Sequence, residues 1–377
     1  MSPRRLATIA TVLTLQLVTA CGGGGGGADV ADQPGTSPVT ATPTAPVSAG
    51  GGGAGTPASP VEPTPPTVPT GPDLGARTAA VLATAADADN ACGAIRPFYW
   101  EIGDHSGRAV GGSVGSTPAG ARIRETTTMR YASATKWLYA AYVAQLRGGV
   151  LQPWDARMLS MRSGYVDFAG CRASQTVDGC LAWQDNDRQT PAADGAFYYG
   201  GGHMQKHASL IGLGELDAAG LASAWRAVLG EDLAIGMLQA RPGGGAMGTP
   251  ATYAAFLRKL LSGELVLGAM LGDNAVCASV GGCAAGEALY SPAPARETWH
   301  YGYGHWIEDD AATGDGAFSS AGAFGFYPWI DASRTQYGIV AREVANGSGD
   351  EEGIGAGEAS ARCGRLIRRA WASGVAA

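Results

Sequence analysis

The order of the predicted elements indicates an α+β fold, an α/β sandwich in which one antiparallel sheet is built from both ends of the folded chain. Two strand-like segments come early, where the residues alternate enough to predict strands, and three more strand-like segments come late. A mixed region of helix and loop, about residues 150–294, separates the two groups and is expected to form an inserted, mostly helical lobe. The expected strands are 96–103, 108–114, 299–307, 323–330 and 336–343.

The first elements of the sheet are preceded by a helix and joined by a turn. Residues 78–92 are rich in alanine, which favours a helix. The two early strands flank the sequence Asp-His-Ser-Gly at 104–107, whose residue types are typical of turns. These segments therefore predict a helix followed by a β-hairpin.

Four further helices are predicted farther along the chain. The first covers 133–147 and ends at Gly148 and Gly149, and the next two cover 221–229 and 250–261. The last helix covers 357–372, where apolar residues recur at helical spacing and arginines occupy the other side. A sheet made from both chain ends would bring the first and last helices together.

The first 75 residues are expected to lie outside the fold. Two arginines precede an apolar stretch that ends at Cys21, which is typical of an export signal. The sequence Leu-Val-Thr-Ala-Cys at 17–21 resembles the lipobox of bacterial lipoproteins, and this resemblance implies a signal peptide at 1–21 with lipid on Cys21. The alternative is an ordinary secretory signal. Residues 22–75 are rich in Gly, Pro and Thr, so we expect a disordered tether.

The remaining residues, 76–377, are sufficient for one large domain. The chain has 26 basic and 33 acidic residues, a net charge of −7, which gives no indication of nucleic-acid binding. No apolar run after the signal is long enough to span a bilayer, so membrane contact is expected only through the lipid anchor. We therefore expect an exported protein on the bacterial envelope, facing the periplasm or the cell surface.

The cysteine count agrees with an oxidising compartment. With Cys21 lipidated, six cysteines remain, and an even number in an exported protein indicates disulfides. Short loops favour two of the pairs, and the expected proximity of the terminal helices favours the third. The predicted pairs are Cys92–Cys363, Cys171–Cys180 and Cys277–Cys283.

The motif Ser-x-x-Lys at Ser133 and Lys136 is the strongest candidate for chemistry. Lys136 is the only charged residue between Ser133 and Arg147, in a helix that is apolar all round and therefore predicted to be buried. A buried lysine is unfavourable unless it has a partner or a catalytic task. The two side chains share one helix face, so the amine could help to remove the hydroxyl proton. The alternative is a serine N-cap beside a snorkelling lysine.

Five segments in order resemble the serine β-lactamase and penicillin-binding-protein superfamily, in particular its class C and family VIII esterase branch. The resemblance covers most of residues 76–377. The segments are Val-Leu-Gln-Pro-Trp-Asp at 150–155, Asp-Gly-Ala-Phe-Tyr-Tyr at 194–199, Pro-Gly-Gly-Gly-Ala-Met at 242–247, Tyr-Gly-Tyr-Gly-His-Trp at 301–306 and Ala-Gly-Ala-Phe-Gly at 321–325.

The resemblance implies a β-lactamase/transpeptidase-like fold and a role for each matched residue. Ser133 would be the nucleophile, Lys136 its activating partner and Tyr199 the general base or acid, with Tyr198 as the nearest rival. The backbone N–H groups of Ser133 and Ala323 would form the oxyanion hole. No metal or cofactor is implied.

Two positions depart from the family pattern, and both belong to the expected substrate cleft. The usual Tyr-x-Asn ends in Gly201 here, so an amide is missing unless His203 or Gln205 supplies a donor. The third motif is a triplet that usually begins with Lys or His, but here it begins with Ser320. With no cation there, we expect uncharged small esters or amides as substrates. The triplet is Ser320, Ala321 and Gly322.

Two other patterns suggest different chemistry but are interpreted as structural. Ser113 lies in a Gly-x-Ser-x-Gly sequence, yet it ends a predicted hairpin strand and no helix follows. His203 and His207 have the spacing of two helical metal ligands, but Met204 occupies the position of the zincin glutamate. We therefore expect no metal site.

Three functions remain open after these considerations. The first is a carboxylesterase or amidase that forms an acyl-enzyme on Ser133. The second is a β-lactamase or D-alanyl carboxypeptidase, and the third is a catalytically degenerate, lipid-anchored binding protein. The two altered motifs favour the first or third over the second, and the retention of Ser133, Lys136 and Tyr199 favours the first over the third.

Overall fold

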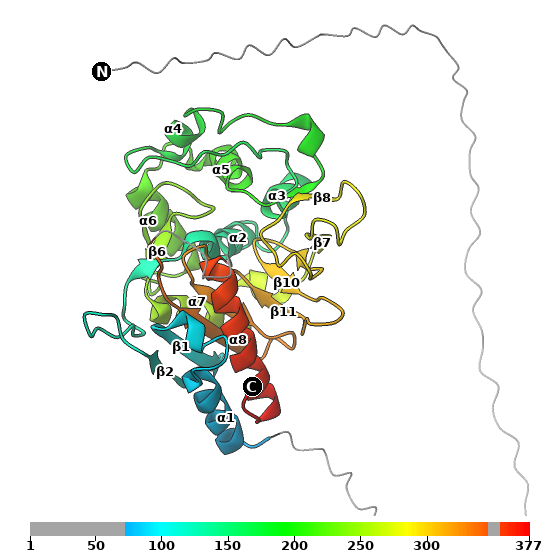
Figure 1. The fold of residues 1–377 in the computed structure, drawn as a ribbon. Helices are drawn as coiled ribbons and strands as arrows, with labels where there is room; N and C mark the ends of the chain where they lie inside the picture. Colours follow the sequence, from blue (N-terminus) through cyan, green and yellow to red (C-terminus); the bar gives the residue numbers. More distant parts are fainter. Residues whose placement is uncertain (1–71, 346–354) are drawn as a thin grey trace, which may run out of the picture. The chain divides into compact units, whose positions relative to one another are not determined.

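The computed structural model describes residues 72–345 and 355–377, and these contain one eight-stranded antiparallel sheet. The strand order is β2-β1-β13-β12-β11-β10-β9-β7, so β1 from the start of the folded chain pairs with β13 from its end, as expected from the sequence (Figure 1). The α+β prediction is confirmed. The strand bounds are β1 Phe98–Asp104, β2 Gly107–Val114, β7 Val276–Cys277, β9 His300–Tyr301, β10 Trp306–Glu308, β11 Ala317–Ser319, β12 Tyr327–Ile330 and β13 Gln336–Ala341.

Strand β1 shows how the sequence assigns its residues to two hydrophobic cores. Phe98, Trp100 and Ile102 are buried in one cluster with the terminal helices. Tyr99 points to the opposite face and belongs to the larger cluster. This alternation follows from the two-residue period of a strand, so a sheet with both faces covered needs apolar residues at every position.

The terminal helices α1 (Leu74–Ala86) and α8 (Ala356–Ser373) pack together on one face of the sheet (Figure 1). The expected pair Cys92–Cys363 is a disulfide in the structure, and it joins segments 271 residues apart. Helix α1 begins and ends earlier than the expected 78–92. Its start is fixed by Asp73, whose side chain accepts a hydrogen bond from the Ala76 N–H at 2.7 Å.

The other face of the sheet is covered by α2 (Thr135–Leu146) and α7 (Pro250–Leu261) (Figure 1). Helix α7 has the bounds that the sequence predicts, with Thr249 as its N-cap. Every residue of α2 from Thr135 to Ala144 is buried. Its all-round apolar sequence is therefore explained by its place in the centre of the molecule.

The inserted lobe contains more strands than the sequence analysis predicted. Its short strands β5 and β6 form a three-stranded sheet with β3, which precedes the lobe, and β4 and β8 form a parallel pair, while β7 joins the edge of the main sheet. The bounds outside the main sheet are η1 Gly93–Ile95, β3 Met129–Arg130, η2 Ala132–Ala134, α3 Pro153–Leu159, α4 Val177–Leu181, η3 Pro191–Ala193, β4 Phe197–Tyr198, α5 Gly202–Ala208, η4 Ser209–Leu213, α6 Ala218–Leu229, β5 Gly236–Met237, β6 Ala246–Gly248, η5 Val266–Met270 and β8 Ala288–Tyr290.

The late strands differ from the prediction in number and extent. The expected strand 299–307 is two strands, β9 and β10, because the chain turns at Gly304, whose φ of +72° favours glycine. The expected strand 323–330 begins only at Tyr327, since Gly325 also has a positive φ. Strand β11 was missed by the sequence analysis.

The signal peptide, Cys21 and nearly all of the expected tether lie outside the described residues. Within the described part, no helix combines the length and apolar character that a membrane crossing requires. The two short-loop disulfides, Cys171–Cys180 and Cys277–Cys283, are both present, and these are the pairs expected from the sequence.

Candidate active site

A pocket of about 640 Å³ is lined by residues of β10, of the loop after β11 and of the inserted lobe, and it contains most of the sequence-predicted candidates. Three of them, Ser133, Lys136 and Tyr199, line it together. Aromatic rings from the lobe and the sheet form much of the remaining wall. These are Phe168, Tyr198, Tyr290, Trp299 and Trp306.

Ser133 is held at the entrance to α2 by a short 3-10 helix, η2. The preceding residue, Ala132, has a φ of +47°, a conformation that residues other than glycine adopt rarely and that often occurs at functional sites. The Ser133 side chain is partly exposed, whereas Ala132 and Ala134 are buried. The backbone thus presents one hydroxyl to the pocket.

Lys136 is 2% exposed and makes two hydrogen bonds. Its Nζ donates to the Gly243 carbonyl oxygen at 2.7 Å and to Ser133 Oγ at 3.2 Å. Burial, with a smaller contribution from the positive charge of Arg241, lowers the pKa of Lys136 to about 7. At neutral pH, a substantial fraction of this amine is uncharged and can accept a proton.

Tyr199 lies beside the same amine. Lys136 Nζ is 4.7 Å from the centroid of the Tyr199 ring, which also stacks on Trp306 at 5.0 Å between centroids. Burial raises the pKa of Tyr199 to about 12, although a hydrogen bond with the Ser133 side chain acts in the opposite direction. Tyr199 is therefore protonated at neutral pH. Its rival Tyr198 also lines the pocket but packs against Tyr290.

The two expected oxyanion-hole residues, Ser133 and Ala323, both line the pocket. Ser133 is the second residue of η2, so the short helix offers no acceptor to its N–H. The Ala323 N–H makes none of the main-chain hydrogen bonds found between the described loops. The loop is held by Gly322, whose N–H donates to the Phe326 carbonyl at 2.8 Å. Both residues of the expected oxyanion hole therefore lie at the pocket, next to Lys136.

Three of the four residues that the sequence analysis assigned to the substrate cleft line the pocket. Gly201, Ala321 and Gly322 line the pocket. Ser320 does not, because it is 2% exposed and its hydroxyl donates to the Ser133 carbonyl at 3.3 Å. Its role is to support the main chain at Ser133.

Neither His203 nor Gln205 replaces the missing amide. His203 contacts Ser163 Oγ at 2.7 Å and the Tyr198 carbonyl at 2.9 Å, so both ring nitrogens are used. Gln205 Nε2 donates to two buried carbonyls. The pocket instead contains Arg241, which the sequence analysis did not single out. The sequence feature that could have pointed to Arg241 is its position directly before the Pro-Gly-Gly-Gly run.

The rejected patterns have structural roles. Ser113 lies in β2 and its hydroxyl donates to the Ile123 carbonyl at 2.5 Å. His207 is buried, with Nε2 2.8 Å from Asp155 Oδ1 and Nδ1 2.6 Å from the Tyr139 hydroxyl. It therefore belongs to a buried polar network beneath α2.

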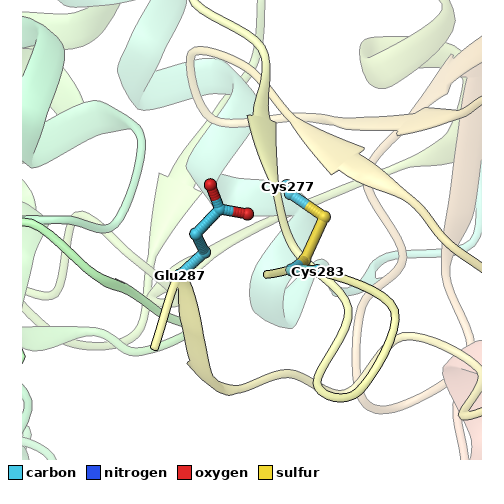
Figure 2. A group of neighbouring side chains, drawn as sticks. All are labelled: Cys277, Cys283 and Glu287. Atoms are coloured by element: carbon cyan, nitrogen blue, oxygen red, sulfur yellow. A yellow bond between two sulfur atoms is a disulfide. The ribbon is translucent and has the colours of Figure 1, made fainter. Parts of the chain in front are cut away.

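One group of potential metal ligands occurs in the described residues, formed by Cys277, Cys283 and Glu287. Figure 2 shows that the two sulfurs are joined in a disulfide. A disulfide has no thiolate to offer, and the Glu287 carboxylate accepts the Ala284 N–H at 3.0 Å. This cluster is not suited to hold a metal ion.

Comparisons with known proteins connect this geometry to a fold. No protein-family model matches the sequence, and no curated protein matches it. Among solved structures, the D-amino acid amidase from Ochrobactrum anthropi SV3 complexed with L-phenylalanine aligns with a TM-score of 0.57 and 12% identity, covering 78% of this chain and 98% of that one. EstCE1, a hydrolase with promiscuous acyltransferase activity, gives 0.51 and 13%, covering 79% and 98%.

A third match is the octameric penicillin-binding protein homologue from Pyrococcus abyssi, with a TM-score of 0.51 and 14% identity, covering 79% of this chain and 78% of that one. The chain has the β-lactamase/transpeptidase fold. At these identities the likeness concerns the fold alone. Within this fold, the pocket between the main sheet and the lobe contains the Ser133, Lys136 and Tyr199 cluster.

Proposed function

We propose that this protein is a serine hydrolase that cleaves esters or amides through an acyl-enzyme on Ser133. The supporting observation is the hydrogen bond between Lys136 Nζ and Ser133 Oγ, made by a lysine that is 2% exposed. Keeping an amine there is unfavourable for folding, which is understandable if the amine has a catalytic task. This argues against the degenerate binding protein.

The acylation step uses Lys136 as the proton acceptor. Ser133 Oγ attacks the carbonyl carbon of the substrate and its proton passes to the neutral Lys136 amine. The resulting oxyanion is stabilised by the N–H groups of Ser133 and Ala323. Collapse of the intermediate expels the alkoxide or amine, which takes a proton from the Tyr199 hydroxyl, and Tyr199 regains it from Lys136.

Deacylation reverses these roles. A water molecule attacks the acyl carbon, its proton passes to Lys136, and Ser133 leaves with a proton supplied through Tyr199. Lys136 is preferred over Tyr199 as the first base because the Tyr199 pKa of about 12 leaves few phenolates at neutral pH. The sequence analysis had left Tyr199 as base or acid, and the pKa values favour the acid.

The expectation of an uncharged substrate needs revision. It rested on the absence of a cation at positions 320–322, but the pocket receives a cation from another segment, Arg241. The proposal is therefore an esterase or amidase without restriction to uncharged substrates. β-Lactams are therefore included among the substrates to be tested.

The proposal is tested by covalent labelling of the purified protein with a fluorophosphonate, followed by mass spectrometry of the labelled peptide. We expect label on Ser133, loss of label in Ser133→Ala and unchanged labelling in Ser113→Ala, the matched control on β2. Label retained in Ser133→Ala would contradict the proposal. Turnover of p-nitrophenyl esters, anilides and nitrocefin then ranks the esterase, amidase and β-lactamase activities.

We further propose that the protein is exported and anchored through lipid on Cys21. The three disulfides support an oxidising compartment. Expression in a bacterium fed with radiolabelled palmitate should give a labelled membrane-bound protein, and Cys21→Ala should release it unlabelled. Equal membrane recovery of both proteins would contradict the lipid anchor.

A further inference from the structure

Arg241 is a pocket residue whose guanidinium lacks a carboxylate partner among the described residues. It lines the pocket with Ser133 and Tyr199, and its Cζ lies 5.1 Å from the centroid of the Phe168 ring. Its Nε is buried without a hydrogen-bond acceptor in the described structure. A guanidinium carries five N–H donors in a planar fork. No hydrogen bond from the Arg241 guanidinium is found within the described structure, so its donors are available to a ligand in the pocket.

An unpaired cation in such a position is unfavourable without a compensating partner. Burial lowers the pKa of Arg241, because the apolar wall of the pocket disfavours its charge. The carboxylate that lines this pocket, Glu358, lies 3.1 Å from Arg362 in an ion pair on α8. The charges that face the reaction centre, Lys136 and Arg241, are both basic, so the pocket favours an anion.

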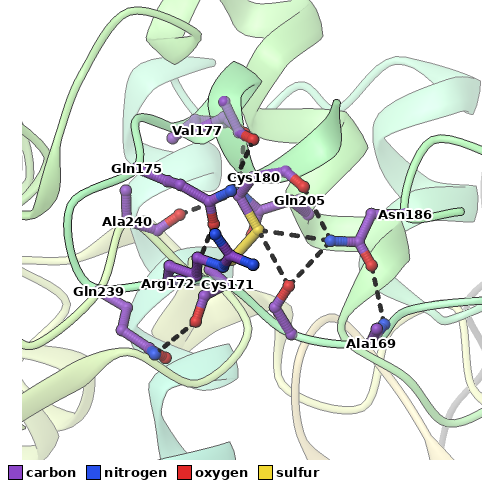
Figure 3. Close-up of a disulfide and its surroundings, with 12 residues drawn as sticks. Ala169, Cys171, Arg172, Gln175, Val177, Cys180, Asn186, Gln205, Gln239 and Ala240 are labelled. Atoms are coloured by element: carbon purple, nitrogen blue, oxygen red, sulfur yellow. Dashed lines mark hydrogen bonds between the residues drawn. A yellow bond between two sulfur atoms is a disulfide. The ribbon is translucent and has the colours of Figure 1, made fainter. Parts of the chain in front are cut away.

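The segment that carries Arg241 is fixed in place by buried hydrogen bonds. Gln239 Nε2 donates to the Cys171 carbonyl at 2.6 Å, and Gln205 Nε2 donates to the Ala240 carbonyl at 2.9 Å. The Cys171–Cys180 disulfide closes the loop on which these contacts rest (Figure 3). Preorganised donors bind a ligand at a lower entropic cost than mobile ones.

The same loop is held from its other side by Asn186. Its Nδ2 donates to the Gly170 and Cys180 carbonyls, each at 2.8 Å, and its Oδ1 accepts the Ala169 N–H at 2.8 Å (Figure 3). Asn186 is 1% exposed. Since Phe168 directly precedes this stretch, the ring beneath the guanidinium is positioned by the same bonds.

Gly201 leaves room for the guanidinium beside Tyr199. A Cβ atom at position 201 would lie 2.8 Å from the Phe168 ring and 3.5 Å from an Arg241 terminal nitrogen. Arg241 thus stands next to the place where the resemblance expects an asparagine side chain. The neutral amide is replaced there by a charged, bidentate donor.

We propose that Arg241 is a specificity-determining residue that pairs with a carboxylate of the substrate, so that the preferred substrates are esters or amides bearing a carboxylate group. The inference rests on the proposed acyl-enzyme function and adds the substrate class. An Arg–carboxylate pair makes two parallel N–H···O bonds, which fixes orientation as well as binding. The anion would lie on the lobe side of the pocket, away from the strand-side triplet 320–322.

A second role for Arg241 has to be separated from this one. Its charge also lowers the pKa values of Lys136 and Tyr199, so a substitution could slow the chemistry for every substrate. A loss through these groups would be the same for charged and neutral substrates. A loss through pairing would affect only the carboxylate-bearing ones and would raise KM.

The experiment compares Arg241→Gln and Arg241→Lys with the wild-type protein on matched substrates. One pair is p-nitrophenyl hemisuccinate and p-nitrophenyl butyrate, which place the charge on the acyl group. The other is p-acetoxybenzoate and its methyl ester, which place it on the leaving group. The control is Arg172→Gln, which removes the same charge from an exposed side chain stacked on Trp183.

We expect Arg241→Gln to lower kcat/KM about 10- to 100-fold for the anionic member of one pair, mainly through KM, with a much smaller change for its neutral partner. Arg241→Lys should retain part of the preference, and Arg172→Gln all of it. An equal loss on both members, or a wild-type preference for both neutral members, would overturn the carboxylate proposal.

Failure of this inference is distinguishable from failure of the proposed function. The fluorophosphonate probe carries no carboxylate that Arg241 could bind. Labelling of Ser133 in Arg241→Gln therefore tests whether Ser133 is a nucleophile, independently of the proposed anion site. Binding of the hemisuccinate ester to Ser133→Ala, measured by calorimetry, reports the anion site without turnover. Tighter binding of hemisuccinate than of butyrate, lost in Ser133→Ala/Arg241→Gln, supports the inference; equal binding overturns it.

Discussion

Lys136 Nζ donates to the carbonyl oxygen of Gly243 over 2.7 Å, so the amine beside the nucleophile is positioned by a residue 107 places farther along the chain. A Cβ atom at Gly243 would lie 3.3 Å from Gly201 Cα and 3.8 Å from Lys136 Cε. The glycine run therefore allows the lobe backbone to approach the centre closely. This contact links the lobe to α2 at the point where the chemistry is proposed.

The first prediction concerns the pH dependence of the reaction. If Lys136 is the base, only its neutral form is active, and its pKa is lowered to about 7 by burial and by Arg241. We expect kcat/KM for a neutral ester to rise with pH, with a midpoint near 7, and to reach a plateau well below pH 10. A midpoint near 10.5, the ordinary value for lysine, would contradict the assignment.

The second prediction concerns the effect of Lys136 on stability. A pKa of about 7 in the folded state, against 10.5 in the unfolded chain, corresponds to roughly 4 kcal/mol of destabilisation at neutral pH. Lys136→Met removes this penalty but leaves the Gly243 carbonyl unpaired, at a cost of about 1–3 kcal/mol. We expect the inactive variant to be more stable by about 1–3 kcal/mol in urea unfolding.

The pH dependence of that difference provides a sharper check. Between pH 7 and 10.5 the unfolded state binds more protons at Lys136, so the wild-type protein should gain stability as the pH rises and the difference should shrink. The matched control is Lys206→Met, which breaks an ion pair with Asp187 near the surface and should cost at most about 1 kcal/mol. A destabilised Lys136→Met protein would refute the argument.

The third prediction concerns the buried ion pairs between β10 and α8. Glu308 on β10 is fully buried and accepts hydrogen bonds from Arg365 and Arg368, each at 2.9 Å. Burial alone would raise the pKa of Glu308, but the two guanidinium groups outweigh it and hold the pKa at about 2. Glu308→Gln should lower the free energy of unfolding by about 3 kcal/mol, because two cations lose their shared partner.

The sign of its pH dependence follows from the lowered pKa. Stability from Glu308 is present above its unfolded value of 4.5 and is lost as the pH falls toward about 2. Unfolding in guanidinium chloride should therefore show a smaller difference in the free energy of unfolding between Glu308→Gln and the wild-type protein at pH 3 than at pH 7. Glu264→Gln, an exposed partner of Lys259, should change stability by less than about 1 kcal/mol. Similar effects of the two substitutions would contradict a buried network.

Much of the fold was predictable because it depends on local patterns. The uncompensated charge of Lys136 in an apolar helix indicated a buried functional group, and the spacing of Ser133 and Lys136 placed both on one face. Arg241 was not predictable in this way. It enters the pocket because Gln239 and Gln205 hold its segment against a distant loop, and no periodicity in the sequence encodes those contacts.

The missed strands have a similar explanation. Strand β7 has two residues and pairs with β9 only because the lobe returns to the sheet edge, and β11 has three. Segments this short carry too few residues for an alternation to be recognised. The role of Ser320 was mistaken because the sequence shows its place in a motif, whereas its burial beneath Ser133 depends on the packing of β11 and the η2 turn.

The last prediction uses two adjacent glycines as a matched pair. A Cβ atom at Gly200 would meet no atom nearer than 3.8 Å, while one at Gly201 would lie 2.8 Å from the Phe168 ring, closer than real contacts allow. Neither residue requires a positive φ, so an alanine is strained at position 201 by packing alone. Gly201→Ala should therefore displace Phe168, and with it the ring on which Arg241 rests, while Gly200→Ala should be tolerated.

The expected result is a change in specificity as well as in rate. Gly201→Ala should lower kcat/KM for the carboxylate-bearing ester more than for its neutral partner, and Gly200→Ala should leave the ratio of the two unchanged. Gly201→Asn, which restores the Tyr-x-Asn pattern, should behave like Gly201→Ala, because the larger side chain needs the space that Phe168 and Arg241 occupy. An increase in activity toward both esters in Gly201→Asn would show that an amide is accommodated there and would contradict the packing argument.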